Sequence, residues 1–222
     1  MVSFQTFYIV RHGDLENPNK IVYNWDGIRG ITLGLSEKGK RQMEKMGDLL
    51  KQKGASFSKI YSSDFLRTRE STKILAKILK IKKVVFMKQL RDVFAPALIG
   101  IPLSELKEKY GGNVYTDYFI KKFHHETIEQ VARRYYQTFL KIIRENLQDA
   151  DLIMVGHGDP IRFFIAKLKN LQKELTEEDY PNLAQTDYLK KGQAWEIKLD
   201  QNNNLVRAQI LGEQSPSSSR DY

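Results

Sequence analysis

The stretch that decides the fold is Phe4-Gln-Thr-Phe-Tyr-Ile-Val10, which runs directly into Arg11-His12-Gly13. A short apolar run of strand-forming residues is typical of a buried strand in a sheet that is covered on both faces. Side chains that follow such a strand point into the crevice where open α/β sheets bind ligands. We therefore predict that His12 is a nucleophile at this edge and that Arg11 holds the anion that it attacks.

Later apolar runs predict further strands, and segments of helical periodicity separate them. The strands are expected at residues 59–61, 84–87 and 152–155, and the helices at residues 36–54, 65–79, 104–110, 126–147 and from 159 onward. Residues 194–199 and 205–211 flank a turn-forming run and predict a hairpin. Strands that alternate with helices favour an α/β fold, a three-layer αβα sandwich with a mainly parallel central sheet. We expect one domain over residues 1–212 and a disordered Ser-rich tail over residues 213–222.

Composition excludes several classes of protein. The 222 residues contain no cysteine, which rules out disulfides, thiolate metal sites and a cysteine nucleophile. No stretch approaches the roughly 18 to 20 apolar residues that cross a bilayer. The N-terminal apolar run is too short for a signal peptide and lacks a basic segment before it, so we expect a cytoplasmic protein.

The formal net charge of +9 raises the question of nucleic-acid binding. The lysines are scattered along helical segments and interleaved with glutamate, as in Ser36-Glu-Lys-Gly-Lys-Arg41, and no nucleic-acid-binding motif is present. This pattern favours a solvated surface over a nucleic-acid interface. A positive field would still attract a small anionic substrate.

Polar residues follow all four predicted parallel strands. They are Arg11 and His12, then Ser62, Ser63 and Arg67, then Asp92, and finally His157. If the strands are neighbours, these groups meet in one crevice. Two histidines, two arginines and one carboxylate make a poor metal site and a good phosphate site, because arginine matches phosphate oxygens bidentately. A neutral imidazole can take a phosphoryl group and pass it to water, with Asp92 as the proton donor to the leaving alcohol.

These motifs resemble the histidine phosphatase superfamily, the phosphoglycerate-mutase-like proteins. The resemblance rests on Arg11-His12-Gly13, Leu35-Ser-Glu-Lys-Gly39, the segment from Ser62 to Arg69, Leu90-Arg-Asp92 and Val155-Gly-His157-Gly158, and it extends over about residues 4–211. It implies a phosphoglycerate-mutase-like fold, a phosphohistidine at His12, and phosphate binding by Arg11, Arg67 and His157. It also implies a carboxylic acid donor at Asp92 and no metal or other cofactor.

The sequence departs from the family pattern at three points. The donor is aspartate where the family commonly has glutamate, so its side chain is one methylene shorter. The usual asparagine seven residues after the arginine of the motif would fall on Pro18, and Asn17 is the better substitute. The mutase pattern around the donor is not visible. We therefore expect a phosphomonoesterase acting on a small phosphorylated molecule, with Asn17, Ser62 and Gly158 as further substrate-binding residues.

Alternatives remain open for the function and for several residues. A cofactor-dependent phosphoglycerate mutase and a non-catalytic phosphate-binding scaffold would use the same pocket, and the oligomeric state is not predicted. Ser62, Ser63 and Asp64 could cap a helix, and Asp159 is expected to cap another with Pro160 at its first position. His124 and His125 are expected to open the long helix, exposed or as caps. Tyr23, Trp25 and Arg29 could line the substrate entrance or pack their own loop down.

Overall fold

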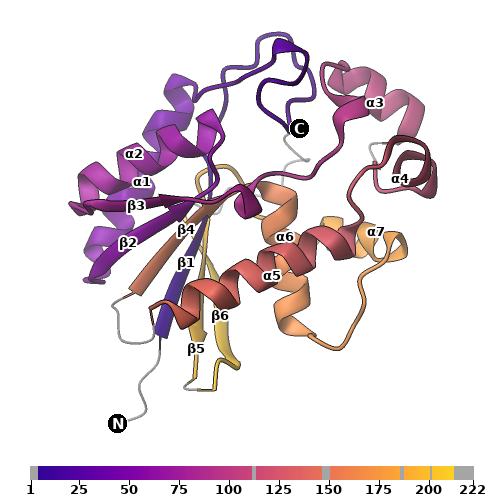
Figure 1. The fold of residues 1–222 in the computed structure, drawn as a ribbon. Helices are drawn as coiled ribbons and strands as arrows, with labels where there is room; N and C mark the ends of the chain where they lie inside the picture. The colour runs from indigo at the N-terminus through magenta and orange to yellow at the C-terminus, as the bar shows by residue number, and fades with distance from the viewer. Residues whose placement is uncertain (1–4, 112–113, 147–150, 186–187, 201, 213–222) are drawn as a thin grey trace.

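Six strands form one sheet in the computed structural model, which describes residues 5–111, 114–146, 151–185, 188–200 and 202–212 (Figure 1). The strands are β1 (Gln5–Arg11), β2 (Phe57–Ser62), β3 (Lys83–Phe86), β4 (Asp151–Gly156), β5 (Ala194–Leu199) and β6 (Leu205–Leu211). Their order across the sheet is β3-β2-β4-β1-β5-β6. The predicted hairpin is confirmed as β5 and β6.

Four neighbouring strands of this sheet run parallel. β2 pairs in parallel with β3 and β4, and β4 pairs in parallel with β1, whereas β5 and β6 add an antiparallel edge. Val10 and Ser62 both lie opposite Val155, one on each side of β4. The residues that follow β1, β2 and β4 therefore emerge side by side at one edge of the sheet.

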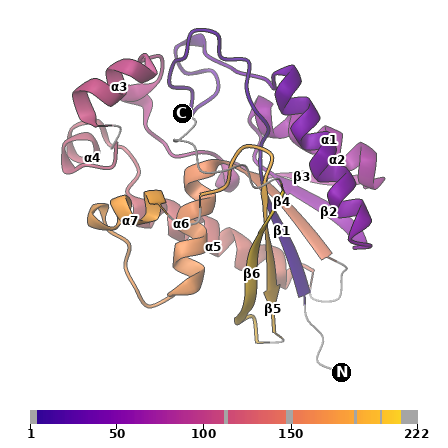
Figure 2. The same ribbon diagram turned by 180° about the vertical axis from the view of Figure 1, so that it is seen from behind.

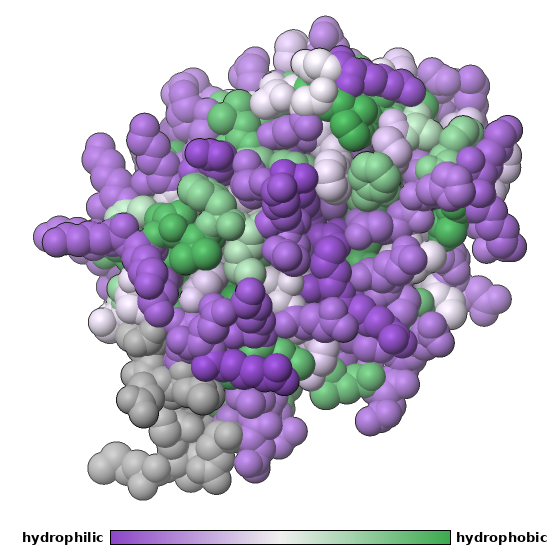
Figure 3. All heavy atoms as spheres, in the orientation of Figure 1, coloured by the Kyte–Doolittle hydropathy of each residue, from purple (hydrophilic) through white to green (hydrophobic). Residues whose placement is uncertain are grey.

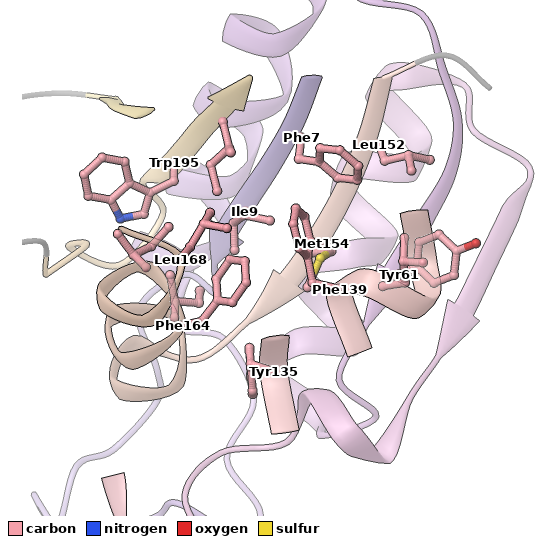
Figure 4. Close-up of a cluster of buried hydrophobic side chains, with 14 of the residues drawn as sticks. Phe7, Ile9, Tyr61, Tyr135, Phe139, Leu152, Met154, Phe164, Leu168 and Trp195 are labelled. Atoms are coloured by element: carbon pink, nitrogen blue, oxygen red, sulfur yellow. The ribbon is translucent and has the colours of Figure 1, made fainter. Parts of the chain in front are cut away.

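Helices cover both faces of the sheet (Figures 1 and 2). α1 (Glu37–Gln52) and α2 (Leu66–Leu79) pack on one face, and α5 (Ile128–Arg144) and α6 (Gly158–Lys169) pack on the other. Side chains of β1 alternate between two apolar cores: Phe7 and Ile9 join Phe139 and Phe164 (Figure 4), and Tyr8 and Val10 join the core under α1 and α2. The predicted three-layer α/β fold is confirmed, and the alternation shows that β1 is buried on both sides.

Three short helices form a cap beside the carboxyl edge of the sheet. They are α3 (Leu103–Tyr110), α4 (Asp117–Phe123) and α7 (Tyr180–Gln185), and both ribbon views place them on the side of α5 and α6. Short 3-10 turns at residues 28–30, 88–90, 96–98 and 177–179 connect the elements. Leu98, Leu106 and Phe119 form a separate apolar cluster with Val22 from the loop after β1, so this loop and the cap pack together.

Two helices begin differently from the sequence prediction. α2 begins at Leu66 after Phe65, which makes no capping bond; the Leu66 N–H instead donates to Asp26 Oδ2 at 2.6 Å. Asp26, from the loop after β1, therefore caps α2, the role that was expected for residues 62–64. The N-cap of α6 is His157 rather than Asp159, because the helix already begins at Gly158.

The residues before α5 also differ from their prediction. Thr127 and Gln130 form a capping box, so α5 begins at Ile128 and neither His124 nor His125 caps it. His125 was expected to be exposed or to cap and is instead buried, with its ring stacked on Phe119 at 5.5 Å between centroids. The apolar cluster of the cap excludes water from this ring.

Hydrophilic residues predominate on the surface in Figure 3, and small apolar patches lie between them. Within the described part of the chain, no helix is both long enough and apolar enough to cross a membrane.

The strand that carries His12 touches the start of α1 without an intervening side chain. A Cβ at Gly39 would lie 2.0 Å from the carbonyl oxygen of Asp14, and one at Gly13 would lie 2.4 Å from the carbonyl oxygen of Gly39. Backbone cannot swing aside as a side chain can, so only glycine fits at both positions.

We expect Gly39→Ala to lower the free energy of unfolding. Forcing a methyl group against backbone should cost about 3 kcal/mol, which exceeds the roughly 1 kcal/mol of helix propensity that alanine gains over glycine. Urea denaturation should show a net loss of about 2 kcal/mol. Glu44→Ala, an exposed position on the same helix, is the control and should change the value by less than about 0.5 kcal/mol. Equal stability of the two variants would contradict the close contact.

Candidate active site

A cavity of about 130 Å³ opens at the carboxyl edge of the parallel strands. Its lining includes Arg11 and His12 from the end of β1, Asp92 from the segment after β3, and Gly158 at the start of α6. Arg67 and His157 join this group through direct contacts and are completely buried. The structure therefore brings together groups that are as far apart in the sequence as residues 11 and 158.

His12 is held as a neutral imidazole with one free nitrogen. Its Nδ1 lies 2.8 Å from the carbonyl oxygen of Gly13, which can only accept a hydrogen bond, so Nδ1 carries the proton and Nε2 has the lone pair. Burial, with the nearby guanidinium groups of Arg67 and Arg11, holds the pKa of His12 well below its ordinary value. A buried neutral imidazole of this kind is suited to nucleophilic attack.

His157 lies beside His12, with the ring centroids 5.4 Å apart. Its Nδ1 accepts from Arg67 Nε at 3.2 Å, and its Nε2 lies 2.9 Å from Ser63 Oγ. Because Arg67 can only donate, His157 carries its proton on Nε2 and donates it to Ser63. Burial also keeps the pKa of His157 well below its ordinary value, with Arg67 and His12 adding to the effect.

The Arg67 guanidinium connects four segments of the chain. Its Nη1 donates to Asp26 Oδ1 at 2.9 Å, and its Nη2 donates to the carbonyl oxygen of Asn24 at 2.7 Å and to Asp92 Oδ2 at 3.1 Å. With the bond to His157, the group touches the loop after β1, the segment after β3 and the end of β4. An arginine cannot lose its proton here, so it supplies a permanent positive charge at the site.

Asp92 has the properties of a proton donor. Burial raises the pKa of Asp92 to about 6, although the positive charge of Arg67 acts in the opposite direction. Its Oδ1 accepts from the N–H of Val93 at 2.9 Å, and its Oδ2 lies 3.5 Å from His157 Nδ1. Arg134 of α5 donates to the backbone oxygens of Gln89 and Arg91 at 2.8 and 2.9 Å, which fixes the segment that carries Asp92.

Arg11 is fixed by the segment before β5. Its Nη1 donates to the carbonyl oxygen of Leu189 at 2.6 Å, and its guanidinium lies 4.6 Å from the centre of the Tyr188 ring. Its Nε is buried and has no hydrogen-bond partner in the described part of the chain. A Cβ at Gly158 would lie 2.9 Å from Arg11 Cζ, so a residue without a side chain is needed there.

Two of the predicted binding residues lie apart from the cavity lining. Asn17 folds its amide onto its own loop, donating to the Ile21 carbonyl at 2.9 Å and accepting from the Ile21 N–H at 3.2 Å. Ser62 donates to the carbonyl of Ser63 and accepts from Thr72. Ser63, rather than Ser62, contacts a site histidine.

Several residues of the site were not predicted from the sequence. Asp26 pairs with Arg67, and Asp159, Arg162, Tyr115, Tyr180 and Tyr188 line the cavity. The roles of Tyr23, Trp25 and Arg29 were left open by the sequence. Tyr23 lines the cavity. Trp25 packs against Phe65 and Phe94, and Arg29 donates a hydrogen bond to the carbonyl of Ile99, so these two pack the loop down. The three-residue spacing of Asp159 and Arg162 on one helix was a usable signal for an ion pair. Asp26 and Tyr188 lie on loops, where no helical spacing is available to indicate a contact.

The donor set of the site is cationic and histidine-rich. Within the described ranges, no group of three or more His, Asp or Glu side chains is placed to hold a metal ion. The arrangement can instead hold a phosphate dianion beside Arg11 and Arg67, in the pocket that contains the free Nε2 of His12.

Comparison with known proteins assigns the family. Residues 7–202 match the family model of the histidine phosphatase superfamily (branch 1). The chain belongs to this superfamily, as the sequence motifs predicted.

Relatives include phosphatases and mutases. The chain is 28% identical to a broad-specificity phosphatase of Saccharomyces cerevisiae, over 73% of this chain and 69% of the relative. It is 25% identical to a 2,3-bisphosphoglycerate-dependent phosphoglycerate mutase of Parvibaculum lavamentivorans, over 75% of this chain and 80% of the relative. The structure of a phosphoserine phosphatase of Entamoeba histolytica in complex with 3-phosphoglyceric acid matches with a TM-score of 0.70 at 17% identity, over 95% of this chain and 98% of that chain. This last similarity bears on the fold alone.

We expect Ser63→Ala to destabilise the protein, because the buried Nε2–H of His157 would lose its acceptor. An unsatisfied buried donor costs about 1–3 kcal/mol, which urea denaturation would measure. Ser58→Ala, an exposed position on β2, the strand that Ser63 follows, is the matched control and should have little effect. Equal unfolding free energies for the two variants would show that His157 does not depend on Ser63.

Proposed function

We propose that this protein is a metal-independent phosphomonoesterase that hydrolyses small phosphorylated molecules through a phosphohistidine at His12. The observation that carries the proposal is the neutral imidazole of His12, with Nε2 free, in a pocket that also contains Arg11, Arg67 and His157. A substrate phosphate carries nearly two negative charges, and Arg11 and Arg67 supply positive charge beside it, that of Arg67 being shared with Asp26.

In the first step, the lone pair on His12 Nε2 attacks phosphorus and the bond from phosphorus to the ester oxygen breaks. The departing alkoxide takes the proton of Asp92, and the alcohol leaves. Positive charge around the transferring group stabilises the transition state, and fixed donors supply it without reorganisation. Asp92 can hold the required proton because its pKa is raised to about 6.

In the second step, water attacks the phosphohistidine. The Asp92 carboxylate takes a proton from the water, the phosphorus–nitrogen bond breaks, and inorganic phosphate leaves. His12 returns to its neutral form with Nε2 free, and Asp92 is protonated again. One water is consumed in each cycle, and no other reactant is needed.

A phosphoglycerate mutase is the second candidate, because a mutase of the same superfamily matches over 75% of this chain. It would use the same phosphohistidine and return the phosphate to a substrate instead of to water. A coupled assay with 3-phosphoglycerate and a bisphosphoglycerate primer separates the two reactions. The broad-specificity phosphatase among the relatives favours hydrolysis.

Replacement of the nucleophile is the most direct test. We expect His12→Ala to release no phosphate from p-nitrophenyl phosphate above the uncatalysed rate, while circular dichroism shows a folded protein. EDTA should leave the wild-type rate unchanged. His124→Asn is the control, since His124 is exposed and asparagine tolerates its φ of 55°. Full activity of His12→Ala would contradict the phosphohistidine, and strong inhibition by EDTA would indicate a metal-dependent phosphatase.

The role of Asp92 is tested with two leaving groups. We expect Asp92→Asn to lower kcat for benzyl phosphate by about 10²–10⁴ and to affect p-nitrophenyl phosphate much less, because nitrophenolate leaves without a proton. Asp92 must be protonated in the free enzyme, so kcat/KM for benzyl phosphate should fall as pH rises through about 6. The Asp92→Asn variant measured with the same ester shares the titration of the phosphate itself, so the ratio of the wild-type and variant profiles isolates Asp92. Equal losses for both esters would contradict proton donation by this residue.

A further inference from the structure

Beyond the phosphate end, the wall of the active-site cavity is apolar and aromatic. Aliphatic side chains come from the loop after β1, the segment after Asp92 and the cap helices: Val22, Val93, Leu98, Leu103, Leu106 and Val114. Tyrosines complete this wall, which we call the outer wall: Tyr23, Tyr115, Tyr180 and Tyr188. A wall of this composition favours an apolar or aromatic group over a hydrated one.

The charges in the outer wall cancel. Apart from Arg11 and Asp92 at the phosphate end, the charged residues among the described lining are Asp159 and Arg162, which form an ion pair with each other. Tyr115 donates its hydroxyl to Asp159 Oδ2 at 2.6 Å, so the carboxylate is bonded through both oxygens. A second anionic group on a substrate would therefore have to break a buried ion pair or lie in the wall without a counter-charge, and both are costly.

Aromatic rings also cover the Arg162 guanidinium. Its Cζ lies 4.7 Å from the centre of the Tyr188 ring and 5.1 Å from that of Tyr180. Its Nε is buried and has no partner among the described residues. With its charge compensated by Asp159 and its faces covered by aromatic rings, this guanidinium is poorly suited to bind a carboxylate or a second phosphate of a substrate.

We propose that the substrate of this site is a phosphate monoester of an apolar or aromatic alcohol that carries no second anionic group. The inference rests on the proposed phosphatase function and names its substrate class. The cavity volume of about 130 Å³ is close to the roughly 150 Å³ of an apolar cavity that holds one benzene. The same cavity must also hold the phosphate group, so the buried part of the alcohol is at most about one ring in size.

The test compares three esters that all release aliphatic alcohols: benzyl phosphate, glycerol 1-phosphate and 3-phosphoglycerate. Because their leaving groups are similar, differences in kcat/KM report on the outer wall. We expect benzyl phosphate to exceed the other two by about ten- to hundred-fold, the factor expected for burying one ring. A higher kcat/KM for 3-phosphoglycerate or glycerol 1-phosphate would overturn the inference while leaving the phosphatase function intact.

A variant of the outer wall provides the second arm. Leu103 is half-buried at the start of α3 and takes no part in the proposed mechanism. Leu103→Lys places an uncompensated cation in the wall, so kcat/KM should fall about tenfold for benzyl phosphate and rise for 3-phosphoglycerate. Leu171→Lys, an exposed position outside the cavity, is the matched control, and circular dichroism verifies folding of both variants. An unchanged preference in folded Leu103→Lys would overturn the assignment of the outer wall.

Binding separates this inference from the phosphatase function itself. Calorimetry should show that benzylphosphonate binds the wild-type protein at least about tenfold more tightly than 3-phosphonopropionate, which carries a carboxylate in place of the ring. Tighter binding of 3-phosphonopropionate would overturn the inference. If no ester is hydrolysed, the proposed function is wrong. The ratio of these two affinities still shows whether the pocket prefers an apolar ring or a carboxylate.

Discussion

The site depends on one buried charge, the guanidinium of Arg67. Its side chain has no exposed surface, and its proton cannot be removed, so acceptors must surround it in the folded protein. They come from three places in the chain: Asn24 and Asp26 from the loop after β1, Asp92 from the segment after β3, and His157 from the end of β4. Satisfying this one cation therefore brings the loop after β1, the end of β4 and the segment after β3 to the same place.

The same charge decides which groups near it are protonated. Arg67 adds to burial in lowering the pKa values of both imidazoles, and it opposes the effect of burial on Asp92. Burial prevails at Asp92, where the pKa rises to about 6. Neutral histidines beside a carboxyl group that can hold a proton are the combination that the proposed phosphoryl transfer to and from His12 would require.

The sequence predicts the sheet and the strand ends well, because both depend on local patterns. Residues Phe7 to Val10 are apolar without interruption, so β1 had to be buried on both faces, and the polar groups after it had to lie at its carboxyl edge. The positions of Arg11, His12 and His157 follow from the parallel pairing of β1 with β4. Arg67, in the first turn of α2, contacts the site and is buried there.

Contacts made by loops could not be predicted in this way. Asp26 caps α2 and pairs with Arg67 across about forty residues of chain, and nothing in its neighbouring sequence distinguishes it from a surface carboxylate. Asn17 bonds to its own loop, because the nearby Ile21 backbone offers both a donor and an acceptor. His125 is buried because α4 supplies the aromatic surface that covers it. The sequence analysis did not predict this helix.

The groups that would perform the chemistry and those that would select the alcohol come from different parts of the fold. His12 and His157 follow strands at the centre of the sheet, and Asp92 follows β3, whereas Leu98, Leu103, Leu106 and Val114 belong to the excursion between Asp92 and α5. Replacement of that excursion would change which leaving alcohol the site prefers, and the pairing of the strands would stay the same. Duplicated copies of such a gene could therefore diverge in substrate specificity while keeping one reaction. The cap is the part of the chain in which that divergence would first be found.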